Sequence, residues 1–506
     1  MKYILDINFI LDAITDRSED KDSYFTILLE CVKEKNAYIS SSSLHNIRFV
    51  LKKYHHSFYD KYILLEKKIK IAKLPAYVDK SSNLYENDIE DYLIELSAKA
   101  IDATIITSDK KFLKNSSLTI SPDDFFINEY EKEKSIDFAN LKKQYFMYQP
   151  KLERTMDKVL NNASYIMGSE VKELEDNLQN FTGAKHAITC SSGTDALLLA
   201  MMALDIQADD EIITTPFTFI ATAETIAFLK AKPVFVDIDE KTYNIDPSKI
   251  EEKITSKTKA IMPVSLYGQP ADMDAIQAIA DKHKLKVIID GAQSFGSTYK
   301  GKIDSNLGDI STTSFFPAKP LGCFGDGGAV FTNDDTLATK MKSLRVHGQS
   351  KRYHHQYIGM GGRMDTLQCA IVNVKLKHYK KDLALRQEIA SKYTEALKNK
   401  DLVLPFVNEY ATSAWAQYSI RVNNRDEVQT KLKEQQIPTA VHYPMPLHLQ
   451  ECFEYLGYKE GDFPVADMIS KEIMSLPMNP YVGDDEIEYI SQQLEILFFQ
   501  KDLQDV

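Results

Sequence analysis

KVIIDGAQSFG, residues 286–296, is an apolar run of strand length that ends on the carboxylate of Asp290. Similar short runs lie on either side of it, mostly with helical patterns between them: AKHAITC, DEIITTP, KPVFVDID, TKAIMPVSL and GAVFTND. Strands that alternate with helices are typical of βαβ units, so these runs predict an α/β fold with a mainly parallel sheet. Such sheets bind ligands beyond the carboxyl ends of their strands, where we expect Asp290 to lie. Capping of the following helix is the alternative role for this aspartate.

The chain changes character at a charged stretch, NEYEKEKSIDFANLKKQY at residues 128–145. Before it, short apolar runs alternate with helical patterns. Beyond about residue 382 the pattern becomes helix-rich, with two strand candidates, WAQYSIRV and PTAVHY. A chain of 506 residues is too long for a single core. We therefore predict a front domain at residues 1–130, a large domain at 131–385 and a smaller α+β subdomain at 386–506.

Composition excludes several classes of function. The formal net charge of −12 provides no general attraction to nucleic acid or to an anionic membrane. No apolar run approaches the roughly 20 residues that span a bilayer, and the first residues predict no signal peptide. The five cysteines are scattered and form no CxxC pair, which disfavours a disulfide framework and a zinc site and favours a reducing cytoplasm.

Three further features accompany Asp290. The stretch SSGT at 191–194 lies between a strand and a helix, where glycine and free N–H groups suit phosphate, although a plain helix cap has the same pattern. Lys319 stands between two prolines and is either a solvated turn lysine or a nucleophilic amine. Phe217 and Phe219 follow another strand, where one ring could stack on a flat ligand and both would also suit a core. Phosphate cradle, aromatic ring, acid and amine together predict pyridoxal phosphate as the cofactor.

The chain resembles the nucleotide-sugar aminotransferases, a branch of the fold type I pyridoxal-phosphate enzymes, in the order of six motifs: SSGTDAL, TPFTFIATAE, PVFVDID, DGAQSFG, TSFFPAKPLG and GDGGAVFTND. The resemblance covers about residues 135–497 and implies a homodimer with a shared active site. It implies that Lys319 binds the cofactor aldehyde and that Asp290 pairs with the pyridinium nitrogen. The further cofactor-binding residues that it implies are Gly193, Thr194 and Ser314 for the phosphate, Phe219 for stacking and Gln293 near the ring hydroxyl.

Within this family the chain is most similar to the transaminases that aminate C3 of UDP-2-acetamido-2-deoxy-3-oxo-hexuronate with glutamate, in three stretches: ASYIMGSEVKELE, RVHGQSKRYHHQYIGMGGRMDTLQ and VHYPMPLHLQ. The resemblance implies Arg363 and His442 as contacts of the sugar carboxylate, with Tyr443 beside them. Arginine suits this task because its guanidinium grips a carboxylate through two hydrogen bonds. Gly361 departs from the family, which usually has an asparagine there that reaches the cofactor phosphate across the dimer. A C4 sugar aminotransferase is the nearest alternative.

The front domain resembles the PIN domains, metal-dependent nucleases with a three-layer α/β fold, through a D-x-N and a D-x-x-D pattern and the run ATIITSDKKF. The resemblance implies Mg²⁺ or Mn²⁺ held by Asp6, Asp91 and Asp109, and RNA as the substrate if the domain is active. Capping and turn positions are the alternative role for these aspartates. The second acid of the family is missing from the expected region. A ribonuclease and a degenerate interaction module therefore both stay open as the role of this domain.

Overall fold

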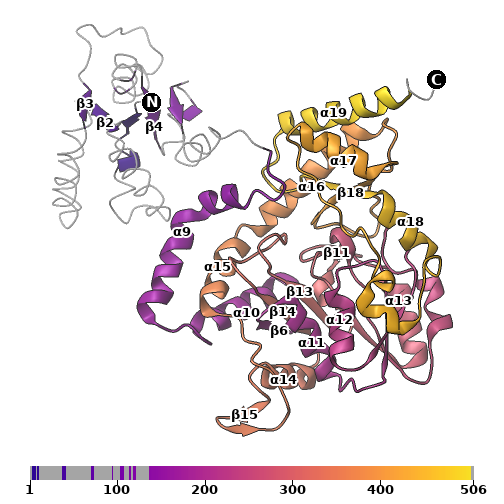
Figure 1. Ribbon diagram of the computed structural model, residues 1–506. Helices are drawn as coiled ribbons and strands as arrows, with labels where there is room; N and C mark the ends of the chain where they lie inside the picture. Colours follow the sequence, from indigo (N-terminus) through magenta and orange to yellow (C-terminus); the bar gives the residue numbers. More distant parts are fainter. Residues whose placement is uncertain are drawn as a thin grey trace. The chain divides into compact units, whose positions relative to one another are not determined.

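The structure is a computed structural model that describes residues 3–6, 8–10, 37–40, 70–72, 94, 98, 103–107, 113–114, 118–120 and 136–502 (Figure 1). The chain divides into two compact units, residues 1–134 with 142–154 and residues 135–141 with 155–506. Among the described helices, none combines the length and the apolar character that a membrane crossing requires.

The first unit contains a five-stranded sheet in which each strand runs parallel to its neighbours. Its order is β3-β2-β1-β4-β5, with the bounds Lys70–Ala72, Ala37–Ser40, Tyr3–Leu5, Thr104–Ile106 and Thr119–Ile120. Asp6 directly follows β1, is buried, and accepts a hydrogen bond of 2.7 Å from the hydroxyl of Thr107. Asp91 and Asp109 lie outside the described residues. The PIN-like fold of this unit and its metal site therefore stay predictions.

The second unit is built on a seven-stranded mixed sheet with the order β6-β14-β13-β10-β9-β7-β8. The bounds in this order are His186–Cys190, Gly328–Thr332, Ile310–Ser314, Lys286–Asp290, Thr258–Ile261, Glu211–Thr214 and Lys232–Phe235. In this sheet β14 runs antiparallel to both of its neighbours, and the remaining pairs are parallel. The six quoted strand runs are all strands, and the predicted α/β fold is confirmed: the sheet is mainly parallel, and β14 makes it mixed.

Strand β13, with the sequence ISTTS, is not among the predicted strands because it carries no apolar run. Its β-branched threonines nevertheless suit a strand, and their hydroxyls are satisfied by the neighbouring backbone. Thr312 donates to the carbonyl of Ile289 at 3.0 Å, and Thr313 donates to the carbonyl of Gly291 at 3.3 Å. Because Thr312 pairs with Asp290 in the sheet, the loop that follows β13 begins close to the end of β10.

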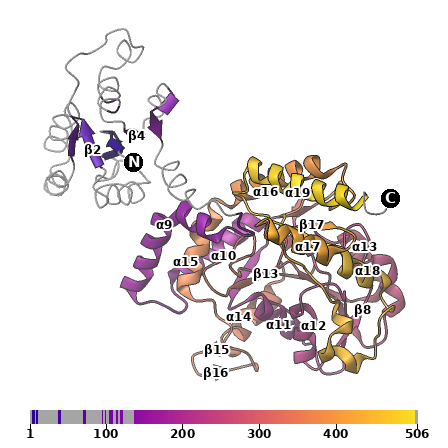
Figure 2. The same cartoon turned by 45° about the horizontal axis from the view of Figure 1, so that its top comes forward.

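Helices cover both faces of the sheet (Figures 1 and 2). Successive strand residues point to opposite faces, so Ile288 belongs to the core on one face while Val287 and Ile289 belong to the core on the other. The first face is covered by α11 (Gly193–Ala203), α12 (Ala221–Phe228) and α14 (Asp335–Leu344). The second face is covered by α10 (Ser169–Thr182), α13 (Met273–His283) and α15 (Thr366–Leu376).

The C-terminal part of the second unit has its own core around the antiparallel pair β17 (Tyr418–Arg421) and β18 (Ile473–Leu476). Its helices are α16 (Tyr379–Leu397), α17 (Arg425–Glu434), α18 (Pro464–Glu472) and α19 (Asp484–Asp502). Strand β17 lies within the predicted run WAQYSIRV. The predicted strand PTAVHY is wrong: Pro438 has no N–H to donate, and a single bridge joins Ala440 to Ser475.

Residues 141–162 form helix α9 (Leu141–Asn162). Two short antiparallel pairs are β11 (Thr298–Tyr299) with β12 (Lys302–Ile303) and β15 (Gln349–Lys351) with β16 (His354–His355).

Candidate active site

Asp290 is the buried acid at the carboxyl end of β10, with 5% of its surface exposed. Its Oδ2 accepts a hydrogen bond of 2.7 Å from the hydroxyl of Thr222 on α12, and its Oδ1 accepts one of 3.2 Å from the N–H of Ala292. Burial raises the pKa of Asp290, while these two donors and the charge of Lys319 act in the opposite direction. The carboxylate thus lies in a dry pocket with its charge only partly compensated, as a cationic ring nitrogen would require.

The Thr222 hydroxyl has one proton, which it gives to Asp290. The hydroxyl of Thr218 lies 3.0 Å away and must therefore be the donor to Thr222. Both threonines are buried. The two hydroxyls form a chain that ends on Asp290 and fixes the orientation of its carboxylate.

Lys319 lies in the loop between β13 and β14 and is half-buried. Its own N–H donates to the carbonyl of Phe316 at 2.8 Å, and the N–H of Cys323 donates to the carbonyl of Phe315 at 2.7 Å, so the loop folds back on itself. Burial lowers the pKa of Lys319, and the negative charge of Asp290 opposes this shift. An amine with a lowered pKa is available as a nucleophile and as a proton carrier, which a solvated turn lysine is not.

The start of α11 meets the end of β13 in a space without room for a side chain. Ser192 caps the helix by accepting a hydrogen bond of 3.0 Å from the N–H of Asp195. A Cβ on Gly193 would come within 2.7 Å of the Cβ of Ser314, and a Cβ on Gly328 within 2.4 Å of the carbonyl oxygen of Ser192. Three backbone segments thus converge at a helix N-terminus, whose free N–H groups suit a phosphate. Thr194, in the first turn of α11, is half-buried beside them.

The two phenylalanines after β7 have different surroundings. Phe217 is fully buried in the core, whereas Phe219 is 53% exposed. The ring centroid of Phe219 lies 6.2 Å from that of Tyr443. Phe219 is therefore the ring of this pair that a flat ligand could contact.

Gln293 joins the large sheet to the C-terminal part of the unit. Its Nε2 donates to the hydroxyl of Tyr443 at 3.0 Å, and its Oε1 accepts from the N–H of Tyr267 at 2.7 Å. Tyr267 in turn donates through its hydroxyl to the carbonyl of His442. Its φ of 57° is unusual for a bulky residue, so the surrounding contacts hold it in place.

His442 is half-buried, and its Nδ1 lies 3.1 Å from the hydroxyl of Ser475. Burial, together with the charge of Lys319, lowers the pKa of His442 to about 4. The imidazole is therefore neutral near pH 7 and acts there through hydrogen bonds. Burial also raises the pKa of Tyr443, so this phenol stays protonated.

Arg363 is half-buried and has no hydrogen-bond or ion-pair partner among the described residues. Its Nη2 lies 3.6 Å from the position that a Cβ on Gly361 would occupy. A free guanidinium is the group that an anionic substrate would require. Hydrogen bonds, ring contacts and charge interactions join six of the predicted residues into one site: Asp290, Lys319, Gln293, Phe219, His442 and Tyr443. Among the described residues, none of these interactions involves Arg363.

Thr218, Thr222 and Tyr267 were not predicted from the sequence. The two threonines stand four residues apart in TPFTFIATAE, a stretch in which the two phenylalanines are the more obvious ligand-binding candidates. Their spacing of four residues was the available signal, although Thr218 precedes the first residue of α12, Ala221. Tyr267 gave no signal, because its contacts depend on its backbone conformation.

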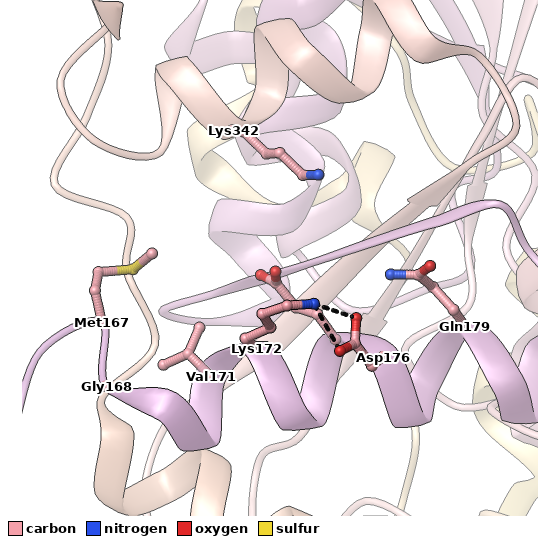
Figure 3. Close-up of a pocket in the computed structure, with 8 residues that line it drawn as sticks. Met167, Gly168, Val171, Lys172, Asp176, Gln179 and Lys342 are labelled. Atoms are coloured by element: carbon pink, nitrogen blue, oxygen red, sulfur yellow. Dashed lines mark hydrogen bonds and ion pairs between the residues drawn. The ribbon is translucent and has the colours of Figure 1, made fainter. Parts of the chain in front are cut away.

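Apart from the predicted site residues, a hollow of about 320 Å³ lies between α10 and α14 (Figure 3). Lys172 and Asp176 form an ion pair of 2.7 Å along one edge of it, and Lys342 points toward it from α14. It contains no predicted site residue. Within the described part of the chain, no group of three His, Cys, Asp or Glu side chains is arranged to hold a metal ion.

Comparison with known proteins identifies the family of the greater part of the chain. Residues 148–495 match the model of the DegT/DnrJ/EryC1/StrS aminotransferase family. The UDP-2-acetamido-2-deoxy-3-oxo-D-glucuronate aminotransferase of Pseudomonas aeruginosa is 50% identical over 71% of this chain and 99% of its own length. The structure of S. venezuelae DesV in complex with a ketimine intermediate superposes with a TM-score of 0.70 at 33% identity, covering 71% of this chain and 97% of that one. That of NtdA from Bacillus subtilis with the bound cofactor PMP gives 0.67 at 27%, covering 75% and 93%.

Proposed function

The chain belongs to the DegT/DnrJ/EryC1/StrS aminotransferase family and is a pyridoxal-phosphate-dependent nucleotide-sugar aminotransferase, and we propose that it aminates C3 of UDP-2-acetamido-2-deoxy-3-oxo-hexuronate with glutamate as the amino donor. The 50% identity to the Pseudomonas aeruginosa enzyme, which extends over nearly all of that protein, carries the choice of substrate. A C4 sugar aminotransferase is the alternative that the substrate test below addresses.

The described residues fit the cofactor, which supplies an electron sink for proton transfer at the carbon that bears the amino group. In this proposal Asp290 pairs with the ring nitrogen, since its carboxylate is buried and lacks a full counter-charge. Gly193, Thr194 and Ser314 form the cradle that holds the phosphate. The cradle requires glycine at 193, because a Cβ there would collide with Ser314. Phe219 and Gln293 contact the ring. These are the cofactor-binding positions that the motifs imply.

Lys319 is the proposed catalytic residue. Its amine binds the cofactor aldehyde in the resting protein and moves the proton at the reacting carbon during transfer. Burial supports both tasks because it lowers the pKa of Lys319. The amine lies close enough to Asp290 that the charge of each residue acts on the pKa of the other.

The sugar carboxylate is assigned to Arg363, with His442 and Tyr443 as hydrogen-bond partners. Arg363 provides the positive charge, and no residue in the described part neutralises it. His442 cannot supply that charge near pH 7, because its pKa is lowered to about 4. The three residues therefore divide into one ionic contact and two neutral ones.

Several further assignments stay predictions. They are a homodimer, a cytoplasmic location, the boundaries 1–130, 131–385 and 386–506, and the loss of a cross-subunit phosphate contact at Gly361. A PIN-like domain with Mg²⁺ or Mn²⁺ and RNA, or a degenerate interaction module, is the corresponding prediction for the first unit.

The substrate assignment is tested by turnover of glutamate with a panel of UDP- and dTDP-linked keto sugars, with the carbonyl at C3 or C4 and with or without a carboxylate at C6. We expect 2-oxoglutarate release to be fastest with the UDP-3-oxo-hexuronate. Arg363→Met should raise KM for that sugar by about tenfold or more and leave KM for sugars without the carboxylate nearly unchanged. Equal turnover of sugars with and without the carboxylate would contradict the assignment.

A further inference from the structure

Lys375, in the last turn of α15, is a lysine in an unusual place. Its side chain is buried, with 2% of the residue exposed. Helix α15 contributes Cys369, Val372 and Leu376 to an apolar core that also includes Cys323, so leucine or methionine would be the ordinary choice at a buried position of this helix. An ammonium group in such a place costs free energy unless it makes strong polar contacts. Burial also lowers the pKa of Lys375 to about 8.

Lys375 contacts the loop that carries Lys319, and the charges of Cys323 and Asp382 also act on it, in the direction that raises its pKa. Its Nζ donates a hydrogen bond of 2.7 Å to the carbonyl of Gly322, and it lies 4.5 Å from the centre of the Phe324 ring. The cation therefore holds this loop through one hydrogen bond and one cation–π contact.

Gly322 packs against the part of the loop just before Lys319. A Cβ on Gly322 would come within 2.4 Å of the carbonyl oxygen of Pro317 and within 2.7 Å of that of Phe316. The backbone of Gly322 therefore lies directly on these two residues. The N–H of Lys319 donates to the carbonyl of Phe316, so the packed segment also carries the reactive lysine.

A second residue of α15 contacts the same loop. The N–H of Phe324 donates to Oε1 of Gln368 at 2.8 Å. Two turns of one buried helix thus hold the carboxyl-terminal side of the loop, while β13 holds its other side. Because both sides of the loop are held, the position of the Lys319 amine depends on the contacts that α15 makes with this loop.

We propose that Lys375 is a positioning residue that holds the loop at Gly322 and so sets the reach of the Lys319 amine toward the cofactor aldehyde. The proposal rests on the proposed role of Lys319. A lysine at a helix C-terminus also stabilises the helix through its dipole, and the experiment must separate this general effect from positioning.

The test compares two ligands of the same site. Pyridoxal phosphate forms a covalent bond with a lysine, whereas pyridoxamine phosphate binds without one. For Lys375→Met we expect the rate of borohydride-trappable attachment of pyridoxal phosphate to fall by about tenfold or more, because one charge-assisted hydrogen bond is lost. Pyridoxamine phosphate affinity, measured by fluorescence quenching, should stay within about twofold of the parent value. Lys375→Arg should recover part of the attachment rate.

Lys377→Met is the matched control, since Lys377 is exposed two residues further on, and it should leave both readouts unchanged. Lys319→Ala tests the underlying assignment separately: if it still traps pyridoxal phosphate at the parent rate, the role of Lys319 is wrong. If Lys375→Met loses both ligands together, Lys375→Gln, which keeps a donor, decides. A parallel loss of both ligands in that variant too, or a parent attachment rate in Lys375→Met, overturns the positioning role.

Discussion

Replacement of Thr222 by valine removes one hydroxyl from the Asp290 pocket and keeps the shape of the side chain. The hydroxyl donates to Oδ2 of Asp290 at 2.7 Å and is itself supported by Thr218. A hydrogen bond to a charged group contributes about 1.5–3 kcal/mol. Since 1.36 kcal/mol corresponds to one pKa unit, the pKa of Asp290 should rise by about one to two units beyond its already raised value.

The direction of the pH effect follows from the charge that the cofactor requires. Pairing with a protonated ring nitrogen needs an ionised carboxylate, so binding is lost as the pH falls through the pKa of Asp290. A further rise in that pKa moves the acidic limb of cofactor binding to higher pH. We expect the limb for Thr222→Val to lie about one unit or more above that of the parent, with affinity approaching the parent value at high pH.

The assay is the affinity of the cofactor-free protein for pyridoxamine phosphate across the pH range, because this ligand reports on the ring pocket without the covalent bond. Thr225→Val is the matched control: Thr225 is equally buried on the same helix, but its hydroxyl donates to the carbonyl of Ala221 at 2.8 Å. If the acidic limbs of Thr222→Val and Thr225→Val coincide, the Thr222 hydroxyl does not set the pKa of Asp290.

Three other substitutions have defined outcomes. Burial raises the pKa of Asp304 to about 6, so ionisation of this side chain opposes folding as the pH rises from about 4 to 6. Asp304→Asn should therefore stabilise the cofactor-free protein by on the order of 3 kcal/mol at pH 8 and progressively less toward pH 4. A denaturation midpoint that does not rise at pH 8 would count against this prediction. Gly193→Ala should weaken pyridoxamine phosphate binding by about tenfold or more while pyridoxamine binds as before, since the added Cβ meets Ser314 at 2.7 Å; equal losses for both ligands would show a general disruption. Tyr267→Phe removes the hydroxyl that donates to the carbonyl of His442. We expect KM for the keto sugar to rise several-fold, about the contribution of one hydrogen bond, and cofactor affinity to stay unchanged. An unchanged KM would show that this hydrogen bond does not position His442 for the sugar.

Local sequence patterns were sufficient to predict six of the seven strands of the large sheet and the position of Asp290. Apolar runs of strand length between turns and helical segments have few alternatives, and a carboxylate at the end of such a run is fixed in place by its neighbours in the chain. The same reasoning failed where local signals were weak. Strand β13 is polar; it pairs with a strand on each side, and the hydroxyl of Thr312 donates to the backbone of the adjacent strand. The run PTAVHY looks like a strand but forms only one bridge.

The order of residues in the chain specifies an acid, an amine, an aromatic ring and the residues of a phosphate cradle, together with the elements that carry them. Whether each of these groups can contact a ligand depends on how the chain packs. Packing exposed Phe219 and buried Phe217, and it lowered the pKa of Lys319 by burial. Thr222 reaches Asp290 across 68 residues, and Lys375 reaches Gly322 across 53. Burial and contacts of this range depend on the packing of the whole sheet against its helices, and no local pattern in the chain encodes them.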